Sequence, residues 1–221
     1  MSRVIAIDGP AASGKSSTAA AVANTLGALH LDSGALYRGL TRVALDEATT
    51  DPGLVLAAAD RRQLVLRLDG VEIAPYLDGA PAEHLIRTSE VTARVSDIAA
   101  LGRCRDWVNV RLRAAAAGDR VLVLDGRDIG TAVFPDARLK VFLTASPESR
   151  ARRRLAQRGE VFDAQSLARE TEALAVRDSL DARRTIAPLR RADDAVLLDT
   201  SDLSFRAQVD IIVALAAKAL S

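Results

Sequence analysis

The 221-residue sequence is 49% apolar and carries 30 basic against 29 acidic residues, a formal net charge of +1. This apolar content can bury one sizeable core, and the balanced charge does not indicate a nucleic acid or a membrane as partner. One cysteine excludes an internal disulfide, and two distant histidines disfavour zinc or Ser-His-Asp chemistry. Neither a signal peptide nor a membrane-spanning run is apparent, so we expect a cytoplasmic protein. We also expect it to be a monomer.

Short apolar runs of strand length alternate along the chain with longer amphipathic runs. The predicted strands cover residues 3–7, 121–124, 139–143 and 195–198. The predicted helices cover residues 16–26, 34–46, 101–117, 164–180 and 204–219, and one more begins at Ser146-Pro147. Serine suits the N-cap of that helix and proline its first turn. Strands that alternate with helices are typical of a parallel sheet covered on both faces.

One region departs from this alternation. Residues 63–68 and 71–73 are apolar runs that flank Asp69-Gly70, a strong signal for a hairpin turn. The sequence therefore predicts a small antiparallel lobe, at about residues 62–85, inserted into the α/β body.

The clearest motif is Gly-Pro-Ala-Ala-Ser-Gly-Lys-Ser at residues 9–16, which matches the phosphate-loop pattern G-x-x-x-x-G-K-[ST] in full. It follows a predicted strand and opens a predicted helix, where successive backbone N–H groups can surround an anion. We expect Lys15 to reach the β- and γ-phosphates of ATP. The predicted ATP site comprises Gly9, Pro10, Ala11, Ala12, Ser13, Gly14, Lys15, Ser16 and Ser17.

A site for Mg²⁺ bound with ATP is expected beside this loop. The hydroxyl of Ser16 is the first predicted ligand. Asp125 follows the apolar run at 121–124, where a carboxylate that organises Mg²⁺ often lies in such folds, although a plain Asp-Gly turn is the alternative. Asp32 is a second candidate carboxylate. The chain has no N-K-x-D motif, which disfavours a GTPase.

Arginines stand beside two other signals in the first part of the chain. An arginine guanidinium matches the oxygens of a phosphate group. Arg38 lies one turn into a predicted helix, where it is placed to hold a second phosphate-bearing substrate; a solvated arginine beside a helix-capping loop is the alternative. Arg127-Asp128 follows the carboxyl end of a predicted strand, the edge at which α/β sheets bind ligands.

Two further groups of charged residues lie nearer the C-terminus. They are Arg150, Arg153 and Arg154, and Arg177, Asp181 and Arg184. On a helix the first group shares one face, and the break at Gly159 makes this tract a candidate lid over an anion; a solvated face is the alternative. The second group also shares a face if its helix continues, and mutual salt bridges are the alternative there.

Together these segments resemble bacterial cytidylate kinases over nearly the whole chain. The segments that carry the resemblance lie at residues 7–16, 31–38, 86–96, 125–137 and 177–189. It implies a P-loop NTPase-type α/β fold of three layers, with a central parallel sheet, helices on both faces and a small inserted antiparallel lobe. The single domain, 1–221, would comprise a core (about 1–38, 100–150 and 180–221), a nucleoside monophosphate-binding insertion (about 39–100) and a lid (about 150–165).

The resemblance also implies roles for individual residues. The phosphate of CMP would be bound by Arg38, Arg127 and Arg184, and its ribose by Arg177 and Asp181. The cytosine would be read by Ser33, Ser96, Arg105 and Asp128, and Tyr37 completes the expected CMP site. The residues expected to act in catalysis are Lys15, Arg127, Arg150 and Arg154.

The implied reaction transfers a phosphoryl group from ATP–Mg²⁺ to CMP or dCMP by in-line attack. The attacking phosphate oxygen is already anionic, so no general base from the protein is required. Two alternatives stay open: another small P-loop kinase that acts on UMP, AMP, dTMP or shikimate, and a module that binds ATP as a switch. The expected partners are ATP and CMP or dCMP, with no nucleic acid and no membrane.

Overall fold

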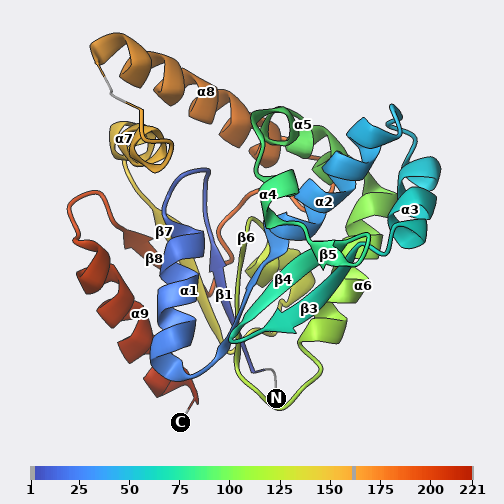
Figure 1. Cartoon of the computed structure of the whole chain (residues 1–221). Coiled ribbons are helices and arrows are strands. Elements are labelled where there is room, and N and C mark those ends of the chain that lie inside the picture. Colours follow the sequence, from blue (N-terminus) through green and yellow to red (C-terminus); the bar gives the residue numbers. More distant parts are fainter. Residues whose placement is uncertain (1–2, 161–162, 221) are drawn as a thin grey trace.

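The computed structural model describes residues 3–160 and 163–220 (Figure 1). The strands are β1 (Val4–Asp8), β2 (Leu29–Asp32), β3 (Val65–Asp69), β4 (Glu72–Leu77), β5 (Ala80–Pro81), β6 (Leu122–Gly126), β7 (Leu139–Thr144) and β8 (Val196–Asp199). The helices are α1 (Lys15–Leu26), α2 (Ser33–Asp46), α3 (Pro52–Arg61), α4 (Glu83–Ile86), α5 (Ser89–Ala100), α6 (Gly102–Ala115), the π-helix η1 (Ile129–Val133), α7 (Pro147–Gln157), α8 (Ala164–Ala182) and α9 (Phe205–Leu220).

A parallel sheet in the order β2-β6-β1-β7-β8 forms the middle layer. All five residues of β1 are buried, which explains why this strand is apolar throughout rather than alternating. One face packs against α1 and α9, and the opposite face packs against α2, α3, α5 and α6 (Figure 1). These two apolar layers confirm the predicted three-layer fold of helices around a parallel sheet.

The predicted hairpin is present and extends this sheet. Strands β3 and β4 are antiparallel, and Gly70 in their turn has φ +61°, which glycine adopts readily. Strand β4 then pairs with β2 in parallel through His30 and Glu72, and the His30 N–H donates to the carbonyl oxygen of Val71 at 3.0 Å. The inserted lobe is therefore hydrogen-bonded to the edge of the central sheet.

Local signals fixed the ends of several predicted helices correctly. Gly27 adopts φ +62° at the C-cap of α1, and Ser146 caps α7 with Pro147 in the first turn. The sequence analysis assigned no element to α3, α4 and α5. Two of them carry caps of their own, because Asp51 accepts from the Leu54 N–H at 2.9 Å and Thr88 from the Val91 N–H at 3.3 Å.

The carboxyl ends of the parallel strands lie side by side. In register, Asp8 at the end of β1 faces Gly126 of β6, and Asp32 at the end of β2 faces Asp125. Ligands of open α/β sheets bind at this edge. Among the described residues, no helix is long and apolar enough to cross a membrane.

Candidate active site

The phosphate loop runs from the end of β1 into α1. A side chain at Gly9 would collide with the carbonyl oxygen of Leu143, so the loop requires glycine there. Gly14 is the N-cap of α1 with φ +91°, and no side chain caps the helix. The N–H groups that open α1 are therefore left for an anionic ligand, as the sequence predicted for an ATP phosphate.

Lys15 is folded back over this loop. Its Nζ donates to the carbonyl oxygen of Pro10 at 2.9 Å, and the residue is only 6% exposed. Burial and the charge of Arg127 hold the pKa of Lys15 well below its ordinary value, while the charge of Asp125 opposes them. A bound triphosphate would place compensating negative charge beside this buried ammonium group.

A chain of hydrogen bonds lies beneath the loop. The Ser16 Oγ donates to Asp125 Oδ2 at 2.5 Å, and Asp125 Oδ1 lies 3.0 Å from His30 Nε2. Burial lowers the pKa of His30, but the hydrogen bond and charge of Asp125 outweigh it, so this pKa is raised. The structure thus brings both predicted Mg²⁺ ligands together, and it adds a histidine to which the sequence analysis gave no role.

Asp32, the other candidate carboxylate, is held elsewhere. Its Oδ1 accepts the N–H of Gly34 at 2.8 Å, and its Oδ2 accepts from Arg87 at 2.8 Å. Burial raises the pKa of Asp32, but the charge of Arg87 outweighs it, and the pKa is lowered. Asp32 therefore caps α2 and pairs with an arginine, whereas Asp125 contacts Ser16.

Asp181 is the centre of the second half of the site. It accepts from Arg127 Nε at 3.0 Å and from Ser96 Oγ at 3.4 Å, and Arg184 Nη2 lies 4.0 Å away. Burial raises the pKa of Asp181, but the charges of Arg127 and Arg184 outweigh it, so the pKa is lowered. The helix ends at Ala182, so the condition for a shared face is not met for Arg184, which reaches Asp181 from beyond the helix.

Arg105 and Asp128 form a buried pair near this centre. The guanidinium of Arg105 donates to Asp128 Oδ2 and, at 2.9 Å, to the carbonyl oxygen of Ala99. It also lies over the ring of Tyr37, 5.3 Å from the centroid. Burial lowers the pKa of Arg105, but the charge of Asp128 outweighs it and raises the pKa. These three predicted CMP-site residues are therefore neighbours, and Ser33 lies nearby, donating to the carbonyl oxygen of Asp125 at 2.7 Å.

Several arginines converge with too few carboxylates to balance them. Arg38 is buried and donates to Thr92 Oγ1 at 2.9 Å, and burial with the charge of Arg87 lowers its pKa to about 10. Burial and the charges of Arg127 and Arg38 lower the pKa of Arg177 to about 9. Within the described part of the chain, the buried Arg177 Nε has no hydrogen-bond partner. Like charges this close repel unless an anion lies between them.

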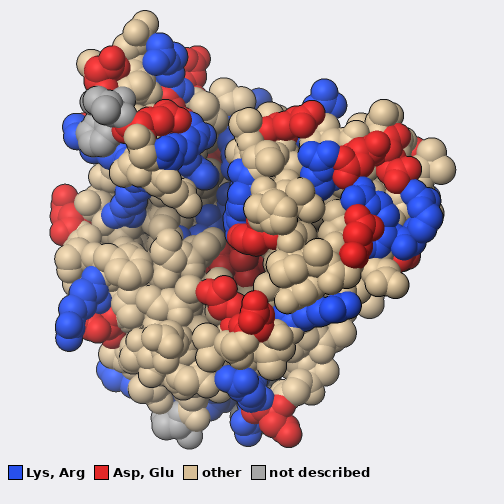
Figure 2. Space-filling model, in the orientation of Figure 1, with Lys and Arg blue, Asp and Glu red and all other residues tan. Residues whose placement is uncertain are grey.

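Basic side chains also gather around a hollow in the surface. Figure 2 shows the hollow between the part of the molecule that contains α7 and α8 and the part that contains α4 and α5, with basic side chains along its walls. Arg154 belongs to the converging arginines, because burial and the charge of Arg158 lower its pKa and the charge of Arg127 adds to the effect.

The predicted lid begins in direct contact with the phosphate loop. Arg150 is 8% exposed and donates to the carbonyl oxygen of Ala11 at 3.0 Å and to Asp178 Oδ2 at 2.5 Å. Asp178 Oδ1 in turn accepts the N–H of Ala11 at 2.8 Å. Arg153 donates to the carbonyl oxygen of Ser13 at 3.1 Å. The shared face of α7 thus faces the loop rather than solvent.

A carboxylate at the end of β1 is also part of the site. Asp8 accepts the N–H groups of Ile129 at 2.9 Å and Gly130 at 2.8 Å. Burial raises the pKa of Asp8 to about 6, although both hydrogen bonds oppose this. The nearby charges are Asp128, which raises this pKa further, and Lys15, which lowers it.

The raised pKa of Asp8 predicts a pH-dependent stability. Folding raises this pKa from 3.8 to about 6, so the folded state binds the proton more tightly and ionised Asp8 costs stability above pH 6. That cost disappears as the pH falls towards 3.8. Relative to Asp8→Asn, the native sequence should gain about 2 kcal/mol in free energy of unfolding between pH 7 and pH 4. Urea unfolding at each pH measures the difference, and a difference independent of pH contradicts the prediction.

Sequence reasoning gave no role to four residues of this site: Asp8, His30, Arg87 and Asp178. Three of them lie within or beside motifs that were singled out, so adjacency was a signal. His30 carried none, because its partner Asp125 is 95 positions away.

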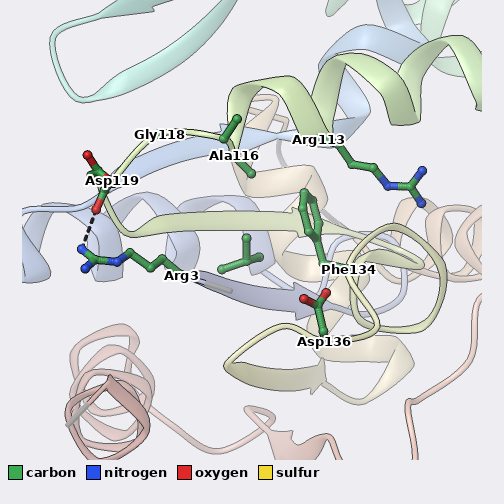
Figure 3. Close-up of a pocket in the computed structure, with 9 residues that line it drawn as sticks. Arg3, Arg113, Ala116, Gly118, Asp119, Phe134 and Asp136 are labelled. Carbon is green, nitrogen blue, oxygen red and sulfur yellow. Dashed lines mark hydrogen bonds between the residues drawn. The ribbon is translucent and has the colours of Figure 1, made fainter. Parts of the chain in front are cut away.

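A separate hollow of about 300 Å³ lies at the opposite edge of the sheet, near the start of β1. Figure 3 shows Arg3 and Arg113 pointing away from each other on either side of it. Arg3 donates to the carbonyl oxygen of Asp119 at 2.6 Å, and Arg113 to that of Val133 at 3.2 Å. Its basic groups therefore do not converge as those of the main site do.

A phosphate loop that opens a helix beside a second arginine cluster, at the carboxyl edge of a parallel sheet, defines a P-loop phosphotransferase with a phosphorylated acceptor. The sequence model of the family described as cytidylate kinase matches residues 5–218. The chain belongs to the cytidylate kinase family.

Curated relatives agree with this assignment, and one solved structure shares the fold. The cytidylate kinase of Streptomyces avermitilis is 42% identical over 215 residues, covering 96% of this chain and 91% of that protein. That of Geobacillus sp. (strain WCH70) is 41% identical over 214 residues, covering 95% and 94%. An uncharacterised protein from Eubacterium ventriosum matches in fold alone, with a TM-score of 0.52 and 12% identity over 97% of this chain and 98% of the other. Family membership confirms the predicted enzyme, an ATP-dependent kinase of CMP and dCMP.

Proposed function

We propose that the two halves of the site divide the two nucleotides between them. The phosphate loop, residues 9–17, binds ATP, and the arginine cluster around Asp181 binds CMP or dCMP. The observation that carries this proposal is the converging cluster itself, in which Arg177 Nε and Arg184 Nη2 are buried without a hydrogen-bond acceptor among the described residues. A second anionic substrate is the natural partner for such donors.

The position of these side chains in the cluster supports the acceptor roles that we propose for them. Arg38, Arg127 and Arg184 bind the CMP phosphate, because guanidinium groups match its oxygens in pairs. Arg177 and Asp181 hold the ribose, whose hydroxyls need a donor and an acceptor.

The base is read at the buried Arg105–Asp128 pair. A carboxylate accepts the amine of cytosine, and a guanidinium donates to its carbonyl oxygen and ring nitrogen. The hydroxyls of Ser33 and Ser96 complete the polar contacts, and the buried Tyr37 supports Arg105. This arrangement favours cytosine over uracil, because uracil carries an oxygen where cytosine carries its amine.

The residues present fit Mg²⁺. Ser16 and Asp125 supply a hydroxyl and a carboxylate oxygen that are already in contact, and His30 orients that carboxylate. Mg²⁺ binds through one or two protein oxygens together with substrate phosphates and water. When bound, it neutralises charge on the ATP phosphates.

Transfer needs alignment and charge neutralisation rather than proton removal. The acceptor oxygen of CMP is anionic, so no general base acts. Lys15, Arg127, Arg150 and Arg154 stabilise the charge that spreads over the transferred group. The lid, about residues 150–165, closes over ATP and excludes water. The insertion, about residues 39–100, carries the CMP side of the site. The enzyme works as a cytoplasmic monomer.

An assay of ADP release across nucleoside monophosphates tests the proposed function. With ATP and Mg²⁺, CMP and dCMP should be phosphorylated, whereas UMP, AMP and dTMP should be much poorer acceptors. Preference for another monophosphate would overturn the base assignment. Tight ATP binding without transfer to any acceptor would identify an ATP-binding module instead.

Asp128→Ala should raise the KM for CMP about 10- to 100-fold and leave the KM for ATP within about twofold, because only the CMP half loses a charged hydrogen-bonding group. The ratio of kcat/KM for CMP to that for UMP should fall as well. Asp119→Ala, an exposed carboxylate at the opposite edge of the sheet, is the control and should change neither constant. Equal losses for ATP and CMP would rule out a base-reading role.

A further inference from the structure

Asp8 caps a helix that lies far from it in the sequence. Its Oδ1 accepts the N–H of Ile129 at 2.9 Å, and its Oδ2 accepts the N–H of Gly130 at 2.8 Å. These are the first two residues of η1, and Asp8 is 5% exposed. A carboxylate from the end of β1 thus satisfies N–H groups that would otherwise be buried without a partner at the start of a π-helix.

Asp128 precedes this helix and would ordinarily cap it. Aspartate is among the best N-cap residues because its own carboxylate accepts from the first free N–H groups. Here the side chain of Asp128 makes no such bond and pairs with Arg105 instead. The local preference of Asp128 is therefore overridden, and its carboxylate faces the CMP half of the site.

We propose that Asp8 is a positioning residue for cytosine recognition, which caps η1 in place of Asp128 and so leaves the Asp128 carboxylate to the base. The proposal rests on the base-reading role of Asp128 in the proposed function. Asp8 also directly precedes Gly9, the first residue of the ATP loop. Asp8 thus links this loop to the backbone that follows Asp128, the cytosine-reading residue. π-helices are rare and often occur at functional sites, which agrees with a maintained geometry here.

Asn at position 8 would remove one of the two acceptors. Its single carbonyl oxygen can accept one N–H of η1, and its amide NH₂ would face the other N–H. This second N–H of the helix must then find a new acceptor. By its position in the chain, one residue before the helix, the carboxylate of Asp128 is suited to accept it. Asp8→Asn should therefore draw Asp128 away from the base without touching the nucleotide directly.

The test is a double-mutant cycle of Asp8→Asn, Asp128→Ala and the double variant, with KM measured for CMP, UMP and ATP. Asp8→Asn should raise the KM for CMP about tenfold, lower the preference for CMP over UMP, and keep the KM for ATP within about twofold. The double variant should be no worse for CMP than Asp128→Ala alone, because both changes act through one carboxylate. Multiplicative effects on the KM for CMP, or equal effects on CMP and ATP, would overturn the proposal.

Two further comparisons separate the possible failures. If Asp128→Ala leaves the preference for CMP unchanged, the base-reading role itself is wrong; if it lowers that preference while Asp8→Asn does not, only the role of Asp8 is wrong. Asp51→Asn is the matched control, because Asp51 caps its own helix α3 and asparagine caps equally well. Should Asp8→Asn fail to fold, Asp8→Ser carries the same measurements with one hydroxyl acceptor and no buried charge.

Discussion

Replacing Lys15 with alanine should lower kcat for CMP phosphorylation by about 10³-fold, because the ammonium group stabilises charge on the transferred phosphoryl group. The group is buried over the loop and bonded only to the carbonyl oxygen of Pro10 among the hydrogen bonds described, so it is poised for a phosphate. The fold should survive, because burial makes the charge of Lys15 unfavourable before ATP arrives. Steady-state kinetics with saturating ATP and CMP measure the loss.

Lys218→Ala is the control for this experiment, since Lys218 is an exposed lysine on α9. It should leave kcat unchanged. Circular dichroism and the melting temperature of Lys15→Ala should match those of the native sequence within the scatter of ordinary surface variants. Near-normal phosphorylation of CMP by a folded Lys15→Ala protein would refute the assignment of the phosphate loop.

Replacing Asp181 with asparagine should affect both CMP binding and stability. The carboxylate is 4% exposed and accepts from Arg127 and Ser96, with Arg184 close by. Removing one partner of a buried charge pair costs about 3–5 kcal/mol, because the remaining charges lose their compensation. We therefore expect the KM for CMP to rise about 100-fold, and the melting temperature to fall by about 6–20 °C.

An added anion gives this prediction its sharpest test. Inorganic phosphate placed among the arginines should raise the melting temperature of Asp181→Asn more than that of the native sequence, because it replaces the missing negative charge. Asp210→Asn is the control; it breaks an exposed ion pair with Arg206 and should change the melting temperature by about 1 °C at most. If Asp181→Asn melts like the native protein and phosphate acts equally on both, Asp181 does not hold the cluster together.

The parts of the fold that depend on local patterns were predicted well. These parts are the phosphate loop, the hairpin turn at Gly70, and four of the five strands of the parallel sheet, all except β2. Each of them depends on residues that are close together in sequence. Strand β2 is short and half of it carries polar residues, His30 and Asp32, so its pattern resembles a loop. Helices α3 and α5 were missed although Asp51-Pro52 and Thr88 mark their starts, because the polar residues around them resemble a linker.

The sequence predicted which residues belong to the candidate site better than it predicted the contacts between them. Arg177 and Asp181 both lie on α8, as the spacing predicted, but Arg184 lies beyond the end of this helix, with its Nη2 4.0 Å from the same carboxylate. The pairing of Arg105 with Asp128 spans 23 positions and that of His30 with Asp125 spans 95. Such contacts depend on how strands and helices pack, which no spacing along one element can reveal. The binding roles of these residues stay predictions until the variants are measured.

The pairing of β4 with β2 limits how the enzyme can move. The acceptor side is not a separate body on a flexible linker, because its hairpin shares backbone hydrogen bonds with the central sheet at His30. Swinging the whole insertion would break them, so we expect it to pivot only in its helices α3, α4 and α5. Strand β2 ends at Asp32, directly before α2, so that stationary edge also carries Arg38. The acceptor phosphate would thus bind to a part of the enzyme that stays in place. The larger movement would be that of the lid over ATP.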